Sequence, residues 1–241
     1  MHAPLLYIPL AIEWVILITA FMPKLLSGMF YSTPKIGLTL WFTYLTSTIL
    51  AGGLAIYLSA WALTEFFNQT WGADSIELEL LNHFGLWVLV AITGIVISIV
   101  NLRTEPLVAE AEIAKNELVQ ASQSIGEFQG IPVRKLLFPV PLAFVAKVEG
   151  KQTIMISESA ISELSEEELN ATYWHELGHI RGHHNLINAV AKLIGLFTPM
   201  FSASKIFIQE SRELTEQAAD NYAKRHASVK ALESARAKFL E

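Results

Sequence analysis

The chain has 241 residues, of which 52% are hydrophobic and only 17% are charged, and its formal net charge is −6. Ordinary soluble domains carry roughly 25% charged residues, so this deficit indicates contact with lipid. The negative charge and the lack of a dense Lys/Arg run argue against a nucleic-acid surface, and the absence of cysteine excludes disulfides, thiolate catalysis and cysteine-ligated zinc.

Three apolar stretches in the amino-terminal part predict membrane spans at about 5–22, 36–63 and 82–101. A spanning helix needs about 20 apolar residues, and the second stretch carries no charge over 28 residues. The first connecting loop contains two lysines and no acid, the second is acidic, and Arg103 follows the third span. Because basic loops stay in the cytoplasm, we expect a multi-pass protein of the cell membrane whose amino terminus faces outward and whose later residues are cytoplasmic.

The composition changes after Arg103, which divides the chain into a transmembrane region at 1–103 and a second domain at 104–241. The stretch after 104 first shows apolar residues at helical spacing. The residues Gly126, Gly130 and Pro132 then predict a loop.

The segment 133–157 contains β-rich runs broken by proline and glycine, which predict two or three short strands. We expect the last run, 152–157 with the sequence QTIMIS, to be an edge strand that can hold an extended peptide by strand addition. Ser165 is followed three residues later by Glu168, a capping-box spacing that predicts a helix starting at Ser165.

This predicted helix carries the sequence YWHELGHIRGHHN, which holds four of the seven histidines of the chain. His175 and His179 are four residues apart, so both imidazoles project from one face and can bind one metal ion. Glu176 lies beside that position and can polarise a water molecule. The pattern is the HExxH signature of zinc peptidases, and its alternative interpretation is a solvated helix whose histidines align by chance.

A catalytic zinc has three protein ligands and one open position, so a third ligand is required. Downstream, Glu216 and Asp220 are again four residues apart on a predicted helical face. The competing candidates are His183 and His184, because a metzincin would place its third histidine close by, at the position that Asn185 occupies here. Glu216 is favoured, since it completes a set of two histidines and one glutamate known at catalytic zinc.

The two motifs, HELGH at 175–179 and EQAAD at 216–220, together resemble those of the integral-membrane gluzincin peptidases. These include the HtpX heat-shock protease, the CAAX prenyl protease type 1 enzymes and the β-lactam-sensor antirepressor peptidases. The resemblance covers about 133–225 and is best for the β-lactam-sensor type, although this sequence has no room for the large sensor domain of those receptors. It implies that Glu216 is the third zinc ligand and that Asp220 orients a ligating histidine.

The apolar segment 186–208 would by hydropathy be a fourth span, which would put His175 and Glu216 on opposite sides of the bilayer. Two lysines and Pro199 divide it into pieces too short to cross about 30 Å of hydrocarbon. We therefore expect a membrane-associated helical hairpin that turns near Pro199, either dipping into the bilayer or packing in the domain.

Together these features predict a membrane α-helical bundle joined to an α+β zincin-like catalytic domain that is mostly helical with a small β-sheet. The expected function is that of a zinc endopeptidase, with one Zn²⁺ per chain, which hydrolyses cytoplasmic or membrane proteins by metal-activated water with Glu176 as general base. Tyr222 and His226 are candidate oxyanion donors.

The alternative function is a catalytically idle zinc-binding membrane regulator, and a transporter-like bundle is disfavoured because its spans lack paired charges. The expected partners are a protein or peptide substrate and the lipid bilayer, and not nucleic acid. The sequence leaves open a homo-oligomer, a regulatory partner and the identity of the substrate.

Overall fold

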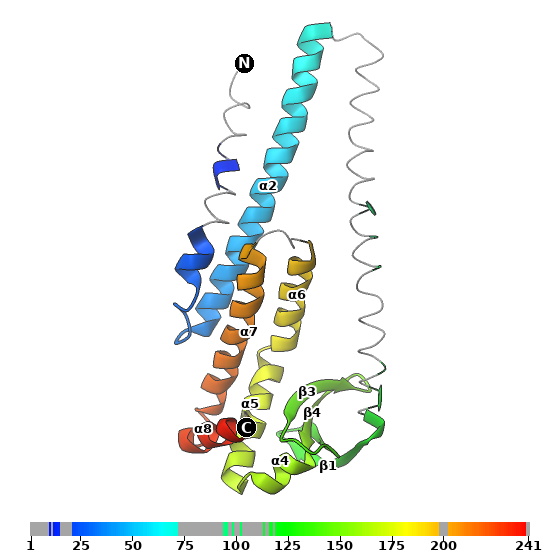
Figure 1. Ribbon diagram of the computed structural model, residues 1–241, viewed down its shortest axis with the longest axis vertical. Coiled ribbons are helices and arrows are strands. Elements are labelled where there is room, and N and C mark those ends of the chain that lie inside the picture. Colours follow the sequence, from blue (N-terminus) through cyan, green and yellow to red (C-terminus); the bar gives the residue numbers. More distant parts are fainter. Residues whose placement is uncertain are drawn as a thin grey trace.

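The computed structural model describes residues 21–71, 121–197 and 202–239, with a few short pieces within 10–14 and 94–120. The first and third predicted spans and the turn at Pro199 lie largely outside these residues. The described part is mostly helical and contains a small mixed sheet, which lies at the end of the molecule opposite the tip of the long helix α2 (Figure 1). The prediction of a mostly helical chain with a small sheet is confirmed.

The sheet has four strands, and their spatial order is β1-β2-β4-β3. In chain order they are β1 (Ser122–Phe128), β2 (Ile131–Leu136), β3 (Ala143–Val148) and β4 (Lys151–Ser157). β2 and β4 pair in parallel, and the two outer pairs are antiparallel. The prediction that 152–157 forms an edge strand is wrong, because β4 lies between β2 and β3 and the free edge beside the helices belongs to β3.

The loop predicted around Gly126, Gly130 and Pro132 is also largely wrong, because most of it is the β1–β2 hairpin. Only Gln129 and Gly130 form the turn, with φ of 51° and 78°. Positive φ at both central residues is the geometry of a type I′ turn, whose twist matches that of antiparallel strands. Gly126 sits inside β1 at a register shift with φ of 140°, a β-bulge that glycine accommodates without strain.

In the described residues five helices follow the sheet. They are α4 (Glu158–Glu163), α5 (Glu166–Arg181), α6 (His184–Phe197), α7 (Ser202–Ala223) and α8 (Val229–Lys238). Of these, α5, α6, α7 and α8 line the site. The predicted capping box at the start of α5 is confirmed: the Glu168 amide donates to Ser165 Oγ, and the Ser165 amide donates to Glu168 Oε2. This cap fixes where α5 begins and hence which of its faces the histidines occupy.

The helices α5 and α7 pack closely, and two small residues permit this. A Cβ atom added to Gly178 of α5 would lie 3.0 Å from the Ala219 Cα atom and 3.2 Å from the Ala219 carbonyl oxygen. A larger side chain at either position would push the two helices apart. The small residues of the two motifs therefore set the distance between the helices that carry their polar residues.

The long helix α2 (Pro34–Trp71) packs by its first half against α7. Trp41 and Phe207 are fully buried in this contact, where the hydrophobic core also includes Leu45, Ala191 and Leu214. The segment Pro34–Ser59 is long and apolar enough to cross a membrane, and no other helix in the described ranges meets this test. Length and composition thus support one of the predicted spans, and the bundle of three is not shown.

Candidate metal centre

The histidines of α5 converge as their four-residue spacing predicts. His175 Nε2 and His179 Nε2 lie 3.1 Å apart, and the two rings meet edge to face. Both side chains are mostly buried, with 17% and 13% of their surface exposed. Their Nε2 atoms consequently point to one common position in front of the helix.

The helix α7 brings Glu216 to the same position. Glu216 Oε2 lies 3.5 Å from His175 Nε2 and 3.6 Å from His179 Nε2. Burial disfavours the charged carboxylate, but the contacts with the two histidines outweigh burial and lower the pKa of Glu216 far below its ordinary value. Glu216 is therefore an anion at neutral pH, as a carboxylate ligand must be.

The three atoms form a triangle with edges of 3.1, 3.5 and 3.6 Å. A tetrahedral zinc ion with bonds of about 2.0–2.1 Å holds neighbouring ligand atoms about 3.3 Å apart. The triangle therefore fits three corners of such a site without rearrangement, and in the described residues it is the one group of this kind. The donor set of two imidazoles and a carboxylate suits zinc.

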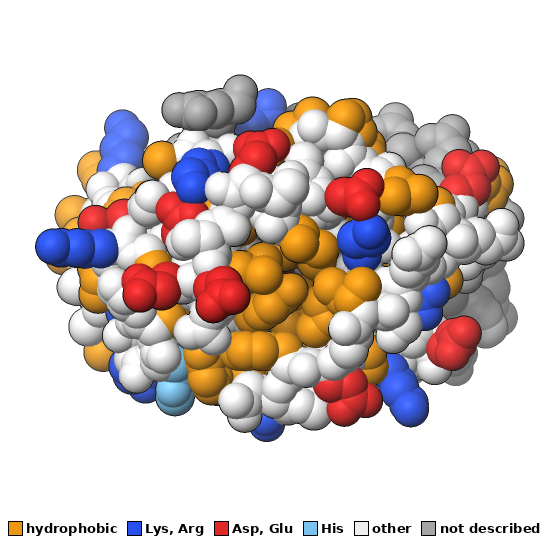
Figure 2. Space-filling view, turned by 90° about the horizontal axis from the view of Figure 1, so that it is seen from below, with side chains coloured by type: hydrophobic (Ala, Val, Ile, Leu, Met, Phe, Trp, Pro, Cys, Tyr) orange, Lys and Arg blue, Asp and Glu red, His pale blue; other side chains and the backbone are white. Residues whose placement is uncertain are grey.

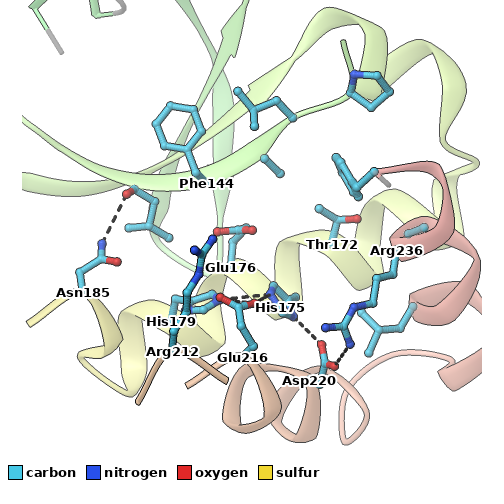
Figure 3. A pocket seen from close by; sticks show the side chains of 17 residues that line it. Phe144, Thr172, His175, Glu176, His179, Asn185, Arg212, Glu216, Asp220 and Arg236 are labelled. Atoms are coloured by element: carbon cyan, nitrogen blue, oxygen red, sulfur yellow. Dashed lines mark hydrogen bonds and ion pairs between the residues drawn. The ribbon is translucent and has the colours of Figure 1, made fainter. Parts of the chain in front are cut away.

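Asp220 lies behind His175, on the side away from the triangle. Its Oδ1 atom is 2.9 Å from His175 Nδ1, and neither atom has another partner among the described residues. Arg236 of α8 donates from Nη1 to Asp220 Oδ2 (Figure 3). Burial raises the pKa of Asp220, but His175 and Arg236 outweigh it and hold the pKa below its ordinary value.

The carboxylates around His175 also change the pKa of its imidazole. Burial disfavours the imidazolium, but the contacts with Asp220 and Glu216 prevail and raise the pKa of His175 to about 10. An imidazole that ligates a metal must be neutral at the ligating nitrogen, so metal binding here is expected to release a proton.

Glu176 is buried, with 7% of its surface exposed, and it lines the same cavity. Burial raises the pKa of its carboxyl above the ordinary value, although the neighbouring histidines counteract this. A carboxylate whose pKa is raised by burial is a better general base than a solvated one. Its carboxylate lies above the triangle, between the histidines and β3 (Figure 3).

The cavity in front of the triangle has a volume of about 460 Å³. One wall is the free strand β3, through Ala143, Phe144 and Val145, and the opposite side is formed by α5, α7 and α8. Asn185 at the start of α6 donates to the Val145 carbonyl oxygen at 3.4 Å. This carbonyl therefore points away from β4, toward the open side of the sheet.

The candidate oxyanion donors Tyr222 and His226 are not brought to this cavity. The His226 ring stacks on Trp174 with centroids 4.2 Å apart, and Tyr222 packs against both rings. Neither residue lines the cavity. The oxyanion role of either residue therefore stays a prediction without a geometric observation beside it.

The competing third ligands lie away from the triangle as well. His183 is exposed, and Asn185 contacts β3 rather than the histidines. His184 is buried and approaches His179, but at Nδ1 instead of Nε2. Burial, followed by the charge of His179, lowers the pKa of His184 to about 4, so this imidazole is neutral.

Sequence reasoning missed two features of the cavity, Arg212 and the strand β3. Arg212 lies one helical turn before Glu216 on α7, and its side chain extends into the cavity (Figure 3). The spacing of four residues from a candidate ligand was a signal that could have identified it. No such signal existed for β3, because its position at the edge depends on the order of the strands.

Comparison with known proteins identifies the family. The model of peptidase family M48 matches residues 115–239, which is just over half of the 241-residue chain. The chain belongs to peptidase family M48. This family of metallopeptidases includes HtpX and CAAX-protease-like peptidases, and its members generally use zinc. The prediction that the chain belongs to a metallopeptidase family is therefore confirmed.

One curated relative also matches. The chain is 31% identical over 120 residues to the plastoglobule-localized metallopeptidase 48, chloroplastic, of Arabidopsis thaliana. The aligned region covers 48% of this chain, and the chain spans about a third of that relative, 34% of its length. This similarity to a metallopeptidase agrees with the M48 assignment.

Proposed function

We propose that the chain is a membrane-embedded zinc endopeptidase that cleaves cytoplasmic or membrane proteins. The observation that carries the proposal is the ligand triangle of His175, His179 and Glu216, which faces a cavity shared with the buried carboxyl of Glu176. A structural metal site needs no buried acid beside an open position, whereas peptide hydrolysis does.

The three ligands would hold one zinc ion, which when bound lowers the pKa of a water molecule and polarises the scissile carbonyl. Glu176 accepts a proton from the attacking water and delivers it to the leaving amine. Asp220 keeps the proton of His175 on Nδ1, so that its Nε2 lone pair stays directed at the ligand triangle. Arg236 holds Asp220 in place from α8.

An extended substrate would bind along the free edge of β3. The outward Val145 carbonyl is an acceptor that a substrate amide can use after displacing Asn185. Phe144 lies on the same strand beside the cavity and supplies an apolar wall (Figure 3). Binding to β3 would place the substrate backbone across the cavity in front of Glu176.

Membrane embedding is supported by the surface of α2. Its segment beyond the contact with α7 exposes large apolar side chains, with 57% of Ile49, 68% of Leu50 and 67% of Tyr57 accessible. Lys35 and Glu65 are the charged residues of this helix, and both lie near its ends. Such a surface is stable in hydrocarbon and unfavourable in water.

The membrane would then lie close to the metal site. The helices α6 and α7 pack beside the first half of α2. The charge of Lys35, in the first turn of α2, is the last of the causes that lower the pKa of His184. We propose a transmembrane region at 1–103 with an external amino terminus, and a cytoplasmic domain at 104–241 whose α6–α7 pair reaches the bilayer. Regulated proteolysis, as in the antirepressor peptidases it resembles, is the narrower form of this proposal.

The test is cleavage by the full chain, purified in detergent, with Glu176→Gln as the matched variant. We expect wild-type protein with one zinc per chain to cleave members of a proteome-derived peptide library, and chelation to stop cleavage until zinc is restored. Glu176→Gln should keep its zinc and lose activity by about 10²–10⁴-fold, since only the base is removed.

The outcome decides between the two functions. A Glu176→Gln variant that cleaves at the wild-type rate contradicts the mechanism. A wild-type chain that binds zinc and cleaves no library member favours the catalytically idle regulator.

A further inference from the structure

The ligand His179 has a second contact that neither the metal triangle nor the mechanism explains. His184 Nδ1 lies 3.1 Å from His179 Nδ1, and the two rings meet at 89°. His184 is 4% exposed, although it belongs to the first turn of α6 beside the exposed His183. A buried imidazole thus faces the nitrogen of His179 that points away from the metal site.

The chain between α5 and α6 is shaped to make this contact. His183 adopts φ of 52°, in the left-handed region that non-glycine residues rarely occupy, and so turns the chain back at the end of α5. A Cβ atom added to Gly182 would lie 2.1 Å from His184 Nε2. The His184 ring therefore occupies the space that only a glycine at 182 leaves free.

The two facing nitrogens can share one proton and no more. If His179 uses its Nε2 lone pair toward the triangle, its Nδ1 must carry a hydrogen. His184 Nδ1 must then be the acceptor, and the proton of His184 must sit on Nε2. The contact is consistent with one pair of tautomers, and that pair leaves His179 ready to ligate a metal.

We propose that His184 is a positioning residue that accepts a hydrogen bond from His179 Nδ1 and thereby fixes the tautomer and ring plane of this ligand. This inference rests on the metal site of the proposed function and does not require that the site be catalytic. The two ligating histidines are held differently: His175 by the Asp220 carboxylate and His179 by a neutral imidazole. Partners of this kind contribute about 10–100-fold to metal affinity.

The experiment measures zinc affinity of the full chain by competition with a chromogenic chelator. His184→Leu removes the acceptor at similar volume and should weaken zinc binding about 10–100-fold. His184→Asn places an amide oxygen near the position of Nδ1 and should restore most of the affinity. His183→Asn, at the exposed neighbour, is the matched control, because asparagine tolerates the left-handed backbone at this position, and it should bind zinc as the wild type does.

Two further measurements separate positioning from a loss of folding. The absorption spectrum of the cobalt-substituted protein should change in His184→Leu and return in His184→Asn, while thermal unfolding midpoints stay alike. Gly182→Ala should displace the His184 ring and reproduce the weakened affinity of His184→Leu.

The inference is overturned if the Leu and Asn variants weaken binding equally, or if neither does. Because affinity is measured without proteolysis, a chain that cleaves nothing but shows the expected affinities contradicts the proposed function and leaves the role of His184 standing.

Discussion

The two ends of α7 lie in opposite surroundings. At its amino-terminal end Phe207 is fully buried against α2, in a region whose outer surface is apolar. At its carboxy-terminal end Glu216 and Asp220 contact His175 and Arg236 directly, and all four residues line the cavity. Seen from the end that carries α4 and α8, the molecule shows charged side chains of both signs around a central apolar area (Figure 2).

If the proposed membrane embedding is right, one end of α7 would lie near lipid and the other end near water. The apolar end, formed by 21–71 with the tips of α6 and α7, has few charges and exposes large side chains, as expected for lipid contact. The opposite end, formed by the sheet, α5, α8 and the second half of α7, pairs the buried carboxylates of Asp220 and Glu168 with His175 and with the partly exposed cations of α8. In the proposed membrane arrangement, the candidate metal site would lie near the boundary between these two ends, where a substrate close to the bilayer could reach it.

The sharpest test of the comparison is topological. The chain has no cysteine, so Leu81→Cys, Gln129→Cys and Lys230→Cys each introduce a single thiol. We expect an impermeant maleimide to label Leu81→Cys in intact cells and the other two variants only after permeabilisation. Gln129 and Lys230 are exposed and belong to parts that pack around α5, so they must share a compartment.

External labelling of Lys230→Cys with internal Gln129→Cys would mean that 186–208 crosses the bilayer. It would separate Glu216 from the two histidines and contradict both the fold and the metal site.

Removing Glu216, the proposed ligand from α7, should have the next largest effect. Glu216→Ala leaves two histidines, and we expect its zinc affinity to fall by more than about 100-fold, beyond the effect of an outer partner. His183→Asn, which removes an exposed histidine of the same stretch and tolerates its left-handed backbone, is the control and should retain zinc. Metal analysis after dialysis against a weak chelator gives the result, and retention by the Glu216 variant would refute the ligand set.

The orienting carboxylate should matter less than the ligand. Asp220→Asn keeps the shape of the side chain but removes the charge that faces His175 Nδ1. We expect zinc affinity to fall about 10–100-fold. Glu213→Gln, an exposed change on the same helix, is the control for charge alone, and equal losses in both variants would remove the specific role of Asp220.

The sequence predicted the candidate metal ligands better than it predicted the strand that lines the cavity. The spacing in HELGH is a local property of helices, so it predicted that His175 and His179 share one face of α5, as they do. The structure brings Glu216 of α7 to the same position, and metal binding by the three residues stays a prediction. The capping box of Ser165 and Glu168 is local in the same sense. Each of these predictions needed only a few consecutive residues and one helix–helix contact.

The errors concern features that depend on distant parts of the chain. The order of the strands made β3 the free edge, since β4 pairs with β2 across a long connection. Gly126 suggested a loop because glycine marks loops and bulges alike. The contact of His184 with His179 depends on a left-handed residue at 183, which no helical periodicity indicates.

The smallest expected effect concerns the support of α5 from α8. Glu168 accepts hydrogen bonds from Ser234 Oγ, from Lys238 Nζ and from the Ser165 amide, and these contacts lower its pKa from 4.5 to about 2. A carboxyl whose pKa is lower in the folded chain stabilises the fold fully above the unfolded value, and this contribution is lost as the pH falls through the folded value.

Replacing this carboxylate should therefore lower the free energy of unfolding only at pH values at which the carboxylate is charged. Glu168→Gln should lower the free energy of unfolding by about 1 kcal/mol at pH 7, and the difference from wild type should shrink between pH 4.5 and about 2. Glu167→Gln removes an exposed charge from the same first turn of α5 and should shift the unfolding midpoint less, because it has no partner in α8 among the described residues. Thermal melts of the three proteins across this pH range provide the measurement. If the difference in unfolding free energy between wild type and Glu168→Gln stays constant with pH, the contact with α8 acts through packing rather than through charge.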